Sequence, residues 1–327
     1  MLMKARVIQF EKTGGPEVLR LETVNISPPG AAEVILRHEA IGVNFIDTYH
    51  RSGLYPLPLP SGLGIEAAGV VEAVGPAVDD IAIGDRVAHC SAGIGAYCDV
   101  QKVAADCLIP LPDSISTELA AGMMVKGLTA QMLLKQVRPL RSGETILLYA
   151  AAGGVGLIAA QWAHSIGARV IGVVGSEAKA QLATKYGCDH VLISGQDNIA
   201  EQVRVLTDGV GVPVVYDSVG KDTFQASLDS LAPLGMYVSF GNASGPPPPL
   251  DLAELMRRGS LFATRPTFAT YVRTAAQLHA AANDLFDRVA CGDIKVDVRQ
   301  RFALADAAEA HRALESRATE GATILIP

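Results

Sequence analysis

The sequence has few aromatic residues and no excess of positive charge. Aromatic residues make up 5% of the 327 positions, against 49% hydrophobic residues overall, which suits a soluble α/β protein rich in Ala, Val, Leu and Gly. The 27 Lys and Arg are outnumbered by 34 Asp and Glu, and a net charge of -7 offers no general attraction to a polyanion. We therefore expect no sequence-independent binding of nucleic acid.

A membrane span and a secretion signal are also missing. The longest nearly apolar stretch, residues 146–160, is shorter than the roughly 18 residues that suggest a membrane helix, and it contains three glycines. The start, MLMKARVIQF, soon alternates and has no apolar block followed by a small-residue cleavage site. We expect residues 146–160 to be buried core and the protein to be cytoplasmic.

Cysteine is scarce, and its spacing does not suggest a metal site. The five residues stand at positions 90, 98, 107, 188 and 291. An odd number in a chain of this size argues against a disulfide framework, and spacings of eight and nine lack the short C-x2-C clips of structural zinc sites. We expect reduced, buried or half-buried thiols.

The chain combines two textures, and 327 residues exceed the ~250 to 300 at which one core usually stops growing. The first 120 or so residues form short Val- and Ile-rich runs between Gly, Pro and Asp, which predicts a small barrel-like β domain. Beyond them, helical stretches alternate with buried strands, which predicts a doubly wound parallel sheet. The expected strands are ARVIQF, EVILRHEAIGV, AAGVVEAVG and DRVAHC, then TILLYA, ARVIGVVG, HVLI, VPVVYDSV and MYVSFG, and finally ATILIP, whereas GPPPPL is an expected loop.

A glycine-rich turn, AAAGGVG at 150–156, follows the first strand of the predicted parallel sheet. The dinucleotide fingerprint G-x-G-x-x-G uses its glycines for a tight turn, for pyrophosphate approach and for helix packing. Those places here are Ala151, Gly153 and Gly156, so the first glycine is missing. A turn that only packs a helix on a strand is the structural alternative. We predict a dinucleotide site, with the helix beginning after Gly156 and with Ala151 avoiding positive φ.

The end of the second strand of this sheet indicates the cofactor. Chains that bind NAD usually carry a carboxylate there, which accepts from the ribose 2′-OH. ARVIGVVG instead ends at Gly175, followed by Ser176, and Lys179 lies one helical turn on. Space and a cation favour a 2′-phosphate, although Glu177 opposes it and Lys179 alone also fits a solvated helix residue. We predict NADPH rather than NADH.

Several motifs resemble those of the quinone oxidoreductases in the medium-chain dehydrogenase/reductase superfamily, in the branch that includes zeta-crystallin. They are GVNFIDTYHRSGLYP, PSGLGIEAAG, GDRV, KGLTA, AAAGGVG and ESRATEGATILIP, and they span almost the whole chain. The resemblance implies a GroES-like β-barrel catalytic domain at 1–123, a Rossmann domain that binds NADPH at 124–265, and a return to the catalytic domain at 266–327. It also implies a homodimer.

The resemblance implies an enzyme without zinc. Zinc-dependent alcohol dehydrogenases of the superfamily carry a cysteine where this chain has Asn44, and a histidine where it has Ile65 between Gly64 and Glu66. An amide and an isoleucine cannot supply the ligands that zinc prefers, and the four-cysteine structural lobe is also absent from the sequence. Hydride delivery to an acceptor that is already electrophilic, a quinone or an enone, avoids the need for a Lewis acid.

The resemblance also assigns site residues. Asn44, Asp47, Tyr49, Tyr55 and Lys126 would form the nicotinamide and substrate cleft, although a helix cap, loop packing and a surface charge are ordinary alternatives for Asp47, the tyrosines and Lys126. The implied cofactor contacts are Asn44, Lys126, Thr129, Gly153, Gly154, Val155, Gly156, Gly175, Ser176, Lys179, Ser194, Ser218, Phe240, Gly241, Asn242 and Arg317. Relatives often have a tyrosine where this chain has Ser194, so the contact there is open.

Two other functions compete with quinone reduction. An NADPH-dependent enone or alkenal reductase would use the same site, and differs only in whether hydride reaches a quinone or an activated C=C bond. A crystallin-like or AU-rich RNA-binding protein is a different class, which the acidic charge and the cofactor turn disfavour.

Overall fold

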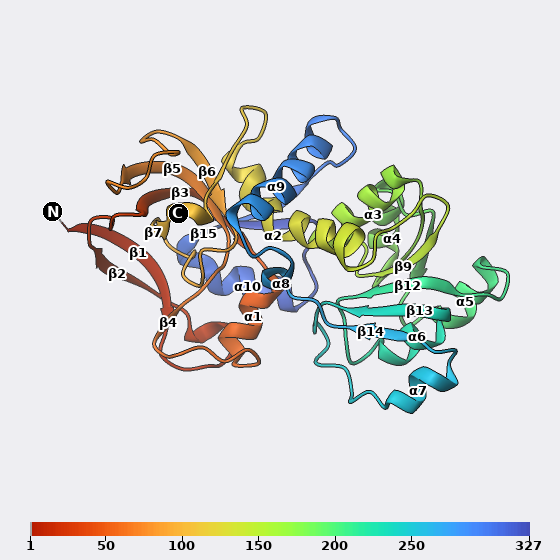
Figure 1. Ribbon diagram of the computed structural model, residues 1–327. Helices are drawn as coiled ribbons and strands as arrows, with labels where there is room; N and C mark the ends of the chain where they lie inside the picture. The colour runs from red at the N-terminus through yellow and green to blue at the C-terminus, as the bar shows by residue number, and fades with distance from the viewer. Residues whose placement is uncertain (1) are drawn as a thin grey trace. The chain divides into compact units, whose positions relative to one another are not determined.

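The computed structural model describes residues 2–327, which form two compact units (Figure 1). The first unit contains the residues up to Leu128 together with Arg273–Ala290 and Val296–Pro327. The second contains Thr129–Val272 and Cys291–Lys295. Among the described residues, no helix is both long enough and apolar enough to cross a membrane.

The first unit is dominated by β structure, as the sequence predicts. A seven-stranded sheet has the order β15-β16-β3-β5-β6-β8, with β7 also pairing with β3, and a smaller sheet has the order β2-β1-β4. Its strands are β1 (Met3–Phe10), β2 (Arg20–Ile26), β3 (Glu33–Val43), β4 (Ser61–Gly62), β5 (Ala67–Val74), β6 (Arg86–His89), β7 (Val100–Ala104), β8 (Ile109–Pro110), β15 (Val298–Ala303) and β16 (Ala322–Ile326). Its helices are α1 (Phe45–Ser52), α2 (Thr117–Gln131), α9 (Ala275–Ala290) and α10 (Ala307–Glu315), and the unit boundary falls within α2.

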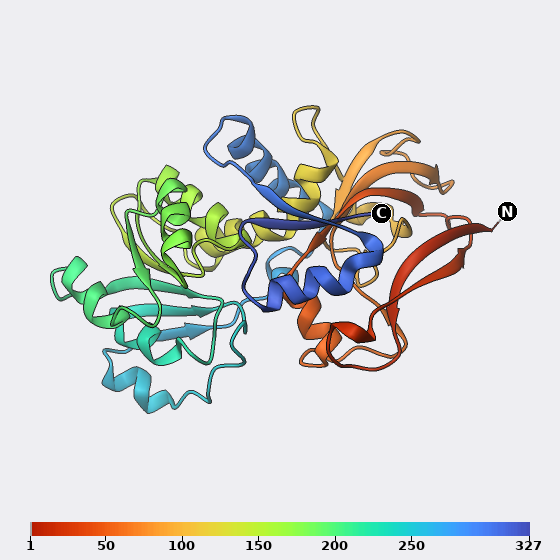
Figure 2. The same cartoon turned by 180° about the vertical axis from the view of Figure 1, so that it is seen from behind.

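The end of the chain completes this first unit. Strand β16, the predicted ATILIP, pairs antiparallel with β3, so that Thr323 lies opposite Val43 and Leu325 lies opposite Ile41. Helix α10 precedes β16 and packs beside α1 (Figure 2). Since β3 leads directly into α1, the last 20 or so residues of the fold support the start of that helix.

The second unit is a doubly wound parallel sheet, as predicted, with the order β11-β10-β9-β12-β13-β14. Helices α3 and α4 lie on one side of the sheet, and α5 and α6 lie on the other (Figure 1). The strands are β9 (Thr145–Tyr149), β10 (Arg169–Val174), β11 (His190–Ile193), β12 (Val212–Asp217), β13 (Leu231–Ser239) and β14 (Phe262–Thr264). The helices are α3 (Gly154–Ile166), α4 (Glu177–Lys185), α5 (Ile199–Leu206), α6 (Phe224–Asp229), α7 (Leu252–Arg257) and α8 (Phe268–Tyr271), and a π-helical turn at Met132–Val137 follows α2.

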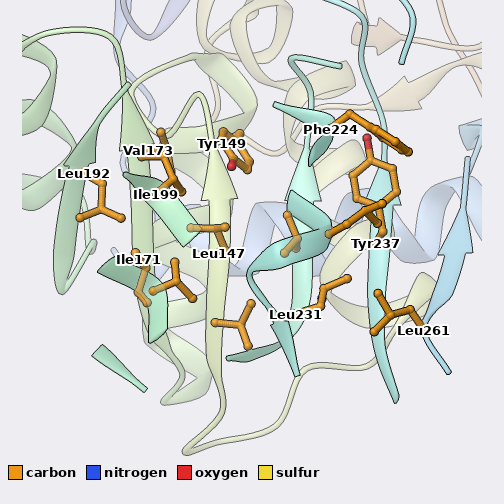
Figure 3. Packing of buried hydrophobic residues seen from close by; sticks show 14 residues of the cluster. Leu147, Tyr149, Ile171, Val173, Leu192, Ile199, Phe224, Leu231, Tyr237 and Leu261 are labelled. Carbon is orange, nitrogen blue, oxygen red and sulfur yellow. The ribbon is translucent and has the colours of Figure 1, made fainter. Parts of the chain in front are cut away.

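One hydrophobic cluster fixes α5 and α6 on this sheet (Figure 3). Leu147 and Ile171 project from the central strands, Ile199 comes from α5, and Phe224 comes from α6. The rings of Phe224 and Tyr237 meet edge to face, with their centroids 5.6 Å apart. Burial of such side chains contributes about 1.5 to 3 kcal/mol each, so this cluster stabilises the packing of α5 and α6 on the sheet.

The interior of the first unit contains a pair of buried histidines. His38 and His89 are both almost fully buried, and their ring centroids are 5.6 Å apart. Burial lowers the pKa of His38 to about 4 and that of His89 to about 3, so both rings are neutral near pH 7.

All five cysteines are free thiols, as expected, but Cys291 is exposed rather than buried or half-buried.

Candidate active site

The first part of the candidate site is built on the start of α1. Asn44 is the N-cap residue, with extended backbone angles, and its backbone N–H donates to Asp47 Oδ2 over 2.8 Å. A carboxylate three residues into a helix satisfies one of the free N–H groups at the helix start. This contact gives Asp47 the capping role that the sequence allowed, and it fixes the backbone of Asn44.

The side chain of Asn44 belongs to a buried triad with Glu66 and Lys126. Its amide donates to Glu66 Oε1 over 2.8 Å, and Lys126 Nζ donates to Asn44 Oδ1 over 3.0 Å and to Glu66 Oε1 over 2.9 Å. Glu66 Oε2 accepts from the backbone N–H of Val125 over 2.6 Å. Only 7% of the Lys126 side chain and none of Glu66 is exposed, so Lys126 is not the surface charge that the sequence left open.

Asp47 is wholly buried, and the oxygen that accepts from Asn44 also accepts from a tyrosine. Tyr97 donates its O–H to Asp47 Oδ2 over 3.0 Å. Burial raises the pKa of Asp47 to about 7, against the opposing effect of the hydrogen bonds from Asn44 and Tyr97. Because Asp47 has no exposed surface, it can orient Asn44 but does not itself face a ligand.

Tyr97 continues into a set of residues that the sequence analysis missed. Its hydroxyl lies 3.1 Å from His311 Nε2, and His311 Nδ1 lies 3.1 Å from Arg51 Nη1. Arg51 makes a two-pronged ion pair with Glu315, with distances of 2.6 and 3.1 Å. No local pattern links positions 51 and 311, and the pairing of β16 with β3 is what brings α10 to α1.

The two predicted tyrosines lie side by side. The rings of Tyr49 and Tyr55 meet edge to face at 5.3 Å, and the backbone N–H of Tyr55 donates to the carbonyl of Tyr49 over 3.0 Å. Tyr49 is 8% exposed, whereas Tyr55 is half-buried. Tyr49 thus packs mainly in the interior, and Tyr55 is the more exposed ring of the pair.

In the second unit, the glycine turn connects β9 to α3. Helix α3 begins at Gly154 with Gly153 as its N-cap, so the expectation that it begins after Gly156 was wrong by three residues. Gly156 lies in the first turn, where a side-chain carbon would overlap the carbonyl of Ala150. Ala151 avoids positive φ, as expected, but Ala150 takes a φ of 53°. The left-handed residue of this turn is therefore an alanine, one position before the place of the missing glycine.

The other predicted cofactor residues of this unit follow the carboxyl ends of its parallel strands. Such strand ends meet at one edge of a sheet, and ligands of open α/β folds bind outside that edge where the strand order reverses, here between β9 and β12. The residues at this edge are Gly153, Gly154, Val155 and Gly156 after β9, Gly175, Ser176 and Lys179 after β10, Ser194 after β11, Ser218 after β12, and Phe240, Gly241 and Asn242 after β13.

The turn has space where a ligand backbone would approach. A side-chain carbon on Gly153 would meet only the carbonyl oxygen of Ala150, at 3.2 Å, and one on Gly175 would meet no atom within 4 Å. Ser176 also has a structural role, because its hydroxyl accepts from the backbone N–H of Lys179 over 3.4 Å at the start of α4. Free helix N–H groups, open glycine surfaces and the absence of a carboxylate at the end of β10 suit a phosphate-bearing dinucleotide.

A buried aspartate that the sequence analysis did not select shapes the neighbouring loop. Asp217 ends β12, and its Oδ1 accepts from the backbone N–H groups of Val219 and Gly220, over 2.8 and 3.1 Å. Its Oδ2 accepts from the hydroxyls of Thr223 and Ser227, both over 2.8 Å. These bonds hold the loop that carries Ser218. A buried strand that ends in Asp was the available sequence signal.

Thr129 and Arg317 complete the predicted set. Thr129 is half-buried on α2, one helical turn beyond Lys126. Arg317 follows α10 in the first unit, with an exposed side chain and a φ of 60°. The predicted clasp of Arg317 with Ser176 and Lys179 joins residues of different units, and it stays a prediction.

The chemistry of the site does not suit zinc. Asn44 contacts a lysine ammonium, and the neighbouring Ile65 has no ligating atom. Within residues 2–327, no group of three or more His, Cys, Asp or Glu side chains is placed to hold a metal ion.

Comparisons with known proteins agree with this arrangement. Residues 30–113 match the alcohol dehydrogenase GroES-like domain family, and residues 154–278 match the zinc-binding dehydrogenase family. A quinone oxidoreductase of Pseudomonas aeruginosa is 52% identical over 324 residues, which cover 99% of this chain and all of that protein. A 2-haloacrylate reductase of a Burkholderia species is 44% identical and covers 97% of this chain and 98% of its own length.

A solved structure extends the match to three dimensions. The quinone oxidoreductase of Escherichia coli, crystallised as a complex with NADPH, superposes with a TM-score of 0.97 at 48% identity. The match covers 98% of this chain and all of that one. The predicted GroES-like domain and parallel-sheet Rossmann domain are confirmed.

The buried triad leads to a prediction about stability. Glu66→Gln removes the charge that balances the Lys126 ammonium, so we expect the free energy of unfolding to fall by about 3 to 5 kcal/mol in urea denaturation. Glu72→Gln is the matched control, because Glu72 on β5 forms a more exposed ion pair with Arg37 on β3. Its loss should lower the free energy of unfolding by less than about 1 kcal/mol. Equal losses in the two variants would contradict a special role for the buried pair.

Proposed function

Since the chain belongs to the quinone oxidoreductase family of the medium-chain dehydrogenase/reductase superfamily, we propose that it reduces small quinones with NADPH and without zinc. The observation that carries the proposal is the glycine turn at the carboxyl edge of the parallel sheet, the edge at which residues following β10, β11, β12 and β13 also lie. NADPH, when bound, supplies a hydride from C4 of its nicotinamide ring, and the quinone accepts it with a proton to become the hydroquinone.

In the proposed reaction, the chain's own residues bind the phosphates of the cofactor, support its adenosine and nicotinamide halves, and stabilise negative charge on the reduced acceptor. The free N–H groups at the start of α3 bind the pyrophosphate, and Ser176, Lys179 and Arg317 bind the 2′-phosphate. Loops 218–220 and 240–242 support the adenosine and nicotinamide halves. Ser194 offers a hydroxyl at the place where relatives often have a tyrosine.

The third task is to stabilise negative charge on the reduced acceptor. Two of the three N–H groups of the Lys126 ammonium point to Asn44 and Glu66, and the remaining one donates to the developing oxyanion. The half-buried ring of Tyr55, held edge to face against Tyr49, provides an aromatic face for the acceptor ring. A quinone is already electron-deficient, so these donors suffice without a metal or a base that removes a proton from an alcohol.

A second acceptor class has specific support. The 2-haloacrylate reductase is 44% identical over nearly the full chain, and its name describes reduction of an activated C=C bond. An enone or haloacrylate reductase is therefore the alternative function, with the same fold and cofactor.

A panel of acceptors tests the proposal. We expect purified protein to oxidise NADPH in the presence of benzoquinone or naphthoquinone, measured by NADPH absorbance, and to fail with simple primary alcohols plus NADP⁺. Activity should survive extensive chelation, and elemental analysis should find no stoichiometric zinc. Alcohol oxidation without quinone turnover, or loss of turnover with one removable zinc per chain, would refute the proposal. Preference for enones or 2-haloacrylate would favour the alternative.

The cofactor preference can be tested at one residue. Lys179→Ala should weaken NADPH binding by about 1.5 to 3 kcal/mol, the range for hydrogen bonds to charged groups, and leave NADH binding nearly unchanged. The substitution keeps the backbone N–H of residue 179, which donates to the Ser176 hydroxyl, so α4 remains capped. Lys185→Ala, at the other end of α4, is the control, and titration calorimetry is the measurement. Equal losses for both cofactors would make Lys179 a structural residue.

We also propose a homodimer formed along β14. This strand is the last in the order of the parallel sheet, and an edge strand presents N–H and C=O groups to a further strand. Phe262 on β14 is 55% exposed, and Leu252 and Met256 on the neighbouring α7 segment are 77% and 67% exposed. A second copy that pairs with this edge through a twofold axis would cover them.

Light scattering should therefore give twice the chain mass of 34.2 kDa. Phe262→Lys should shift the protein towards the monomer, because it places a charge on the proposed interface. Val205→Lys, which changes a 67% exposed residue on α5, should leave the dimer intact. A monomeric parent protein would rule out this arrangement.

A further inference from the structure

A continuous chain of buried hydrogen bonds links α10 to the start of α1. Its members are Arg51, His311, Tyr97 and Asp47, each at most 2% exposed, and it ends on the backbone N–H of Asn44. The successive distances from Arg51 to Asn44 are 3.1, 3.1, 3.0 and 2.8 Å. This chain of hydrogen bonds therefore ends at Asn44, whose side chain accepts from Lys126, the residue that the proposed function assigns to the developing oxyanion.

The first member fixes the direction of all the hydrogen bonds. A guanidinium can only donate, so His311 Nδ1 must accept from Arg51, and the ring proton of neutral His311 must sit on Nε2. His311 then donates to the oxygen of Tyr97, which leaves the Tyr97 O–H to donate to Asp47 Oδ2. Burial and the Arg51 charge lower the pKa of His311 to about 3, and burial beside Asp47 raises the pKa of Tyr97 well above its usual value. Both groups thus keep these protons.

The same logic excludes a proton wire to solvent. The outer end of the chain is the ion pair of Arg51 with Glu315, whose side chain is 35% exposed. A proton arriving from Glu315 would have to pass through Arg51, and a guanidinium does not release a proton in proteins. This series of hydrogen bonds can therefore orient side chains, but it cannot deliver protons from solvent.

We propose that His311 is a positioning residue for quinone reduction, which holds Asn44 in place through Tyr97 and Asp47. Ionised Asp47 accepts from both Tyr97 and the Asn44 backbone. A proton would bind Asp47 Oδ1, which has no hydrogen-bond partner. The neutral carboxyl would then hold the Tyr97 hydroxyl and the Asn44 N–H more weakly, because hydrogen bonds to a charged acceptor are about twice as strong as those to a neutral one. Protonation would therefore loosen the start of α1. The inference rests on the proposed function, because it assigns a role in that reaction.

Among the residues joined by these hydrogen bonds, Asp47 is the group that titrates near neutral pH. The charged and titratable groups around it are Glu66 from the segment before β5, Lys126 from α2, Tyr97 from the segment before β7, His311 from α10 and Arg51 from α1 itself. Burial and Glu66 raise the pKa of Asp47, whereas Asn44, Tyr97 and Lys126 lower it, with a result of about 7. Loss of the hydrogen bond from Tyr97 must therefore raise this pKa further.

The pH profile of quinone reduction tests the proposal. For the parent protein we expect kcat/KM to fall on the acid side with a midpoint near 7. Tyr97→Phe, which deletes one oxygen atom, and His311→Leu should move this midpoint upwards by about one pH unit, a tenfold change in proton affinity. His311→Gln can accept from Arg51 and donate to Tyr97, so it should restore the parent midpoint. His89→Leu is the matched control, because it also removes a buried neutral imidazole but belongs to no bond in this chain, and its midpoint should not move.

A second measurement needs no turnover. Because the folded pKa of Asp47 lies above its unfolded value of 3.8, the stability that proton uptake contributes is lost as pH rises through the folded pKa. Tyr97→Phe should therefore lose further stability relative to the parent between about pH 7 and pH 8, in denaturant unfolding. A constant difference across this range, or variants that lower kcat/KM equally at every pH, would overturn the proposal. A parent protein that reduces no quinone would refute the proposed function alone, since the unfolding measurement still reports on the chain of bonds.

Discussion

The ion pair between Lys126 and Glu66 is the interaction on which the polar site of the first unit depends. Two buried charges are tolerated only when each is satisfied by the other and by further hydrogen bonds. Glu66 therefore accepts from Lys126, from the Asn44 amide and from the Val125 backbone. These three contacts join α1, the segment before β5 and α2. Gly42 on β3 leaves the space for the carboxylate, because a side-chain carbon there would overlap Glu66 Oε1.

This ion pair also determines what kind of chemistry the site favours. An ammonium held by an amide and a carboxylate is a fixed hydrogen-bond donor with a positive charge, and it has no open coordination position at which an alcohol could lose its proton. It stabilises charge that arrives on an oxygen atom. Under the proposed function, the acceptor must therefore be electrophilic before it binds, which quinones and activated alkenes both are.

Periodicity and local motifs were enough to predict the architecture. Ten strand segments were expected from Val- and Ile-rich runs, and each contains a strand in the structure. The glycine turn was predicted at the end of β9, but the start of α3 was misplaced, because glycines carry no side-chain cap that marks a helix start. The resemblance selected Asn44, Asp47 and Lys126, and the structure places them within one hydrogen-bonded cluster.

The residues that were missed have partners far away in sequence. Tyr97 and His311 have no motif around them that indicates a shared site, and His311 reads as an ordinary polar position on an amphipathic helix. Their meeting depends on the pairing of β16 with β3, and the sequence indicates that β16 is a strand but not which strand it joins. Asp217 is a different case, because its partners are local: Thr223 and Ser227 lie 6 and 10 residues further along the chain. A buried strand that ends in Asp was a usable signal there, and it was not used.

The return of the chain to its first unit has a consequence for synthesis. Arg51 and His311 are separated by 260 residues, and the whole second unit lies between them. A ribosome therefore makes every strand of the parallel sheet before it makes α10 and β16. Domains fold as units during synthesis, so the second unit can assemble while β3 still lacks the neighbour that β16 later supplies. During that interval the buried groups around Asp47 are open to water, and the nascent first unit must be kept from aggregating until the last strand is released.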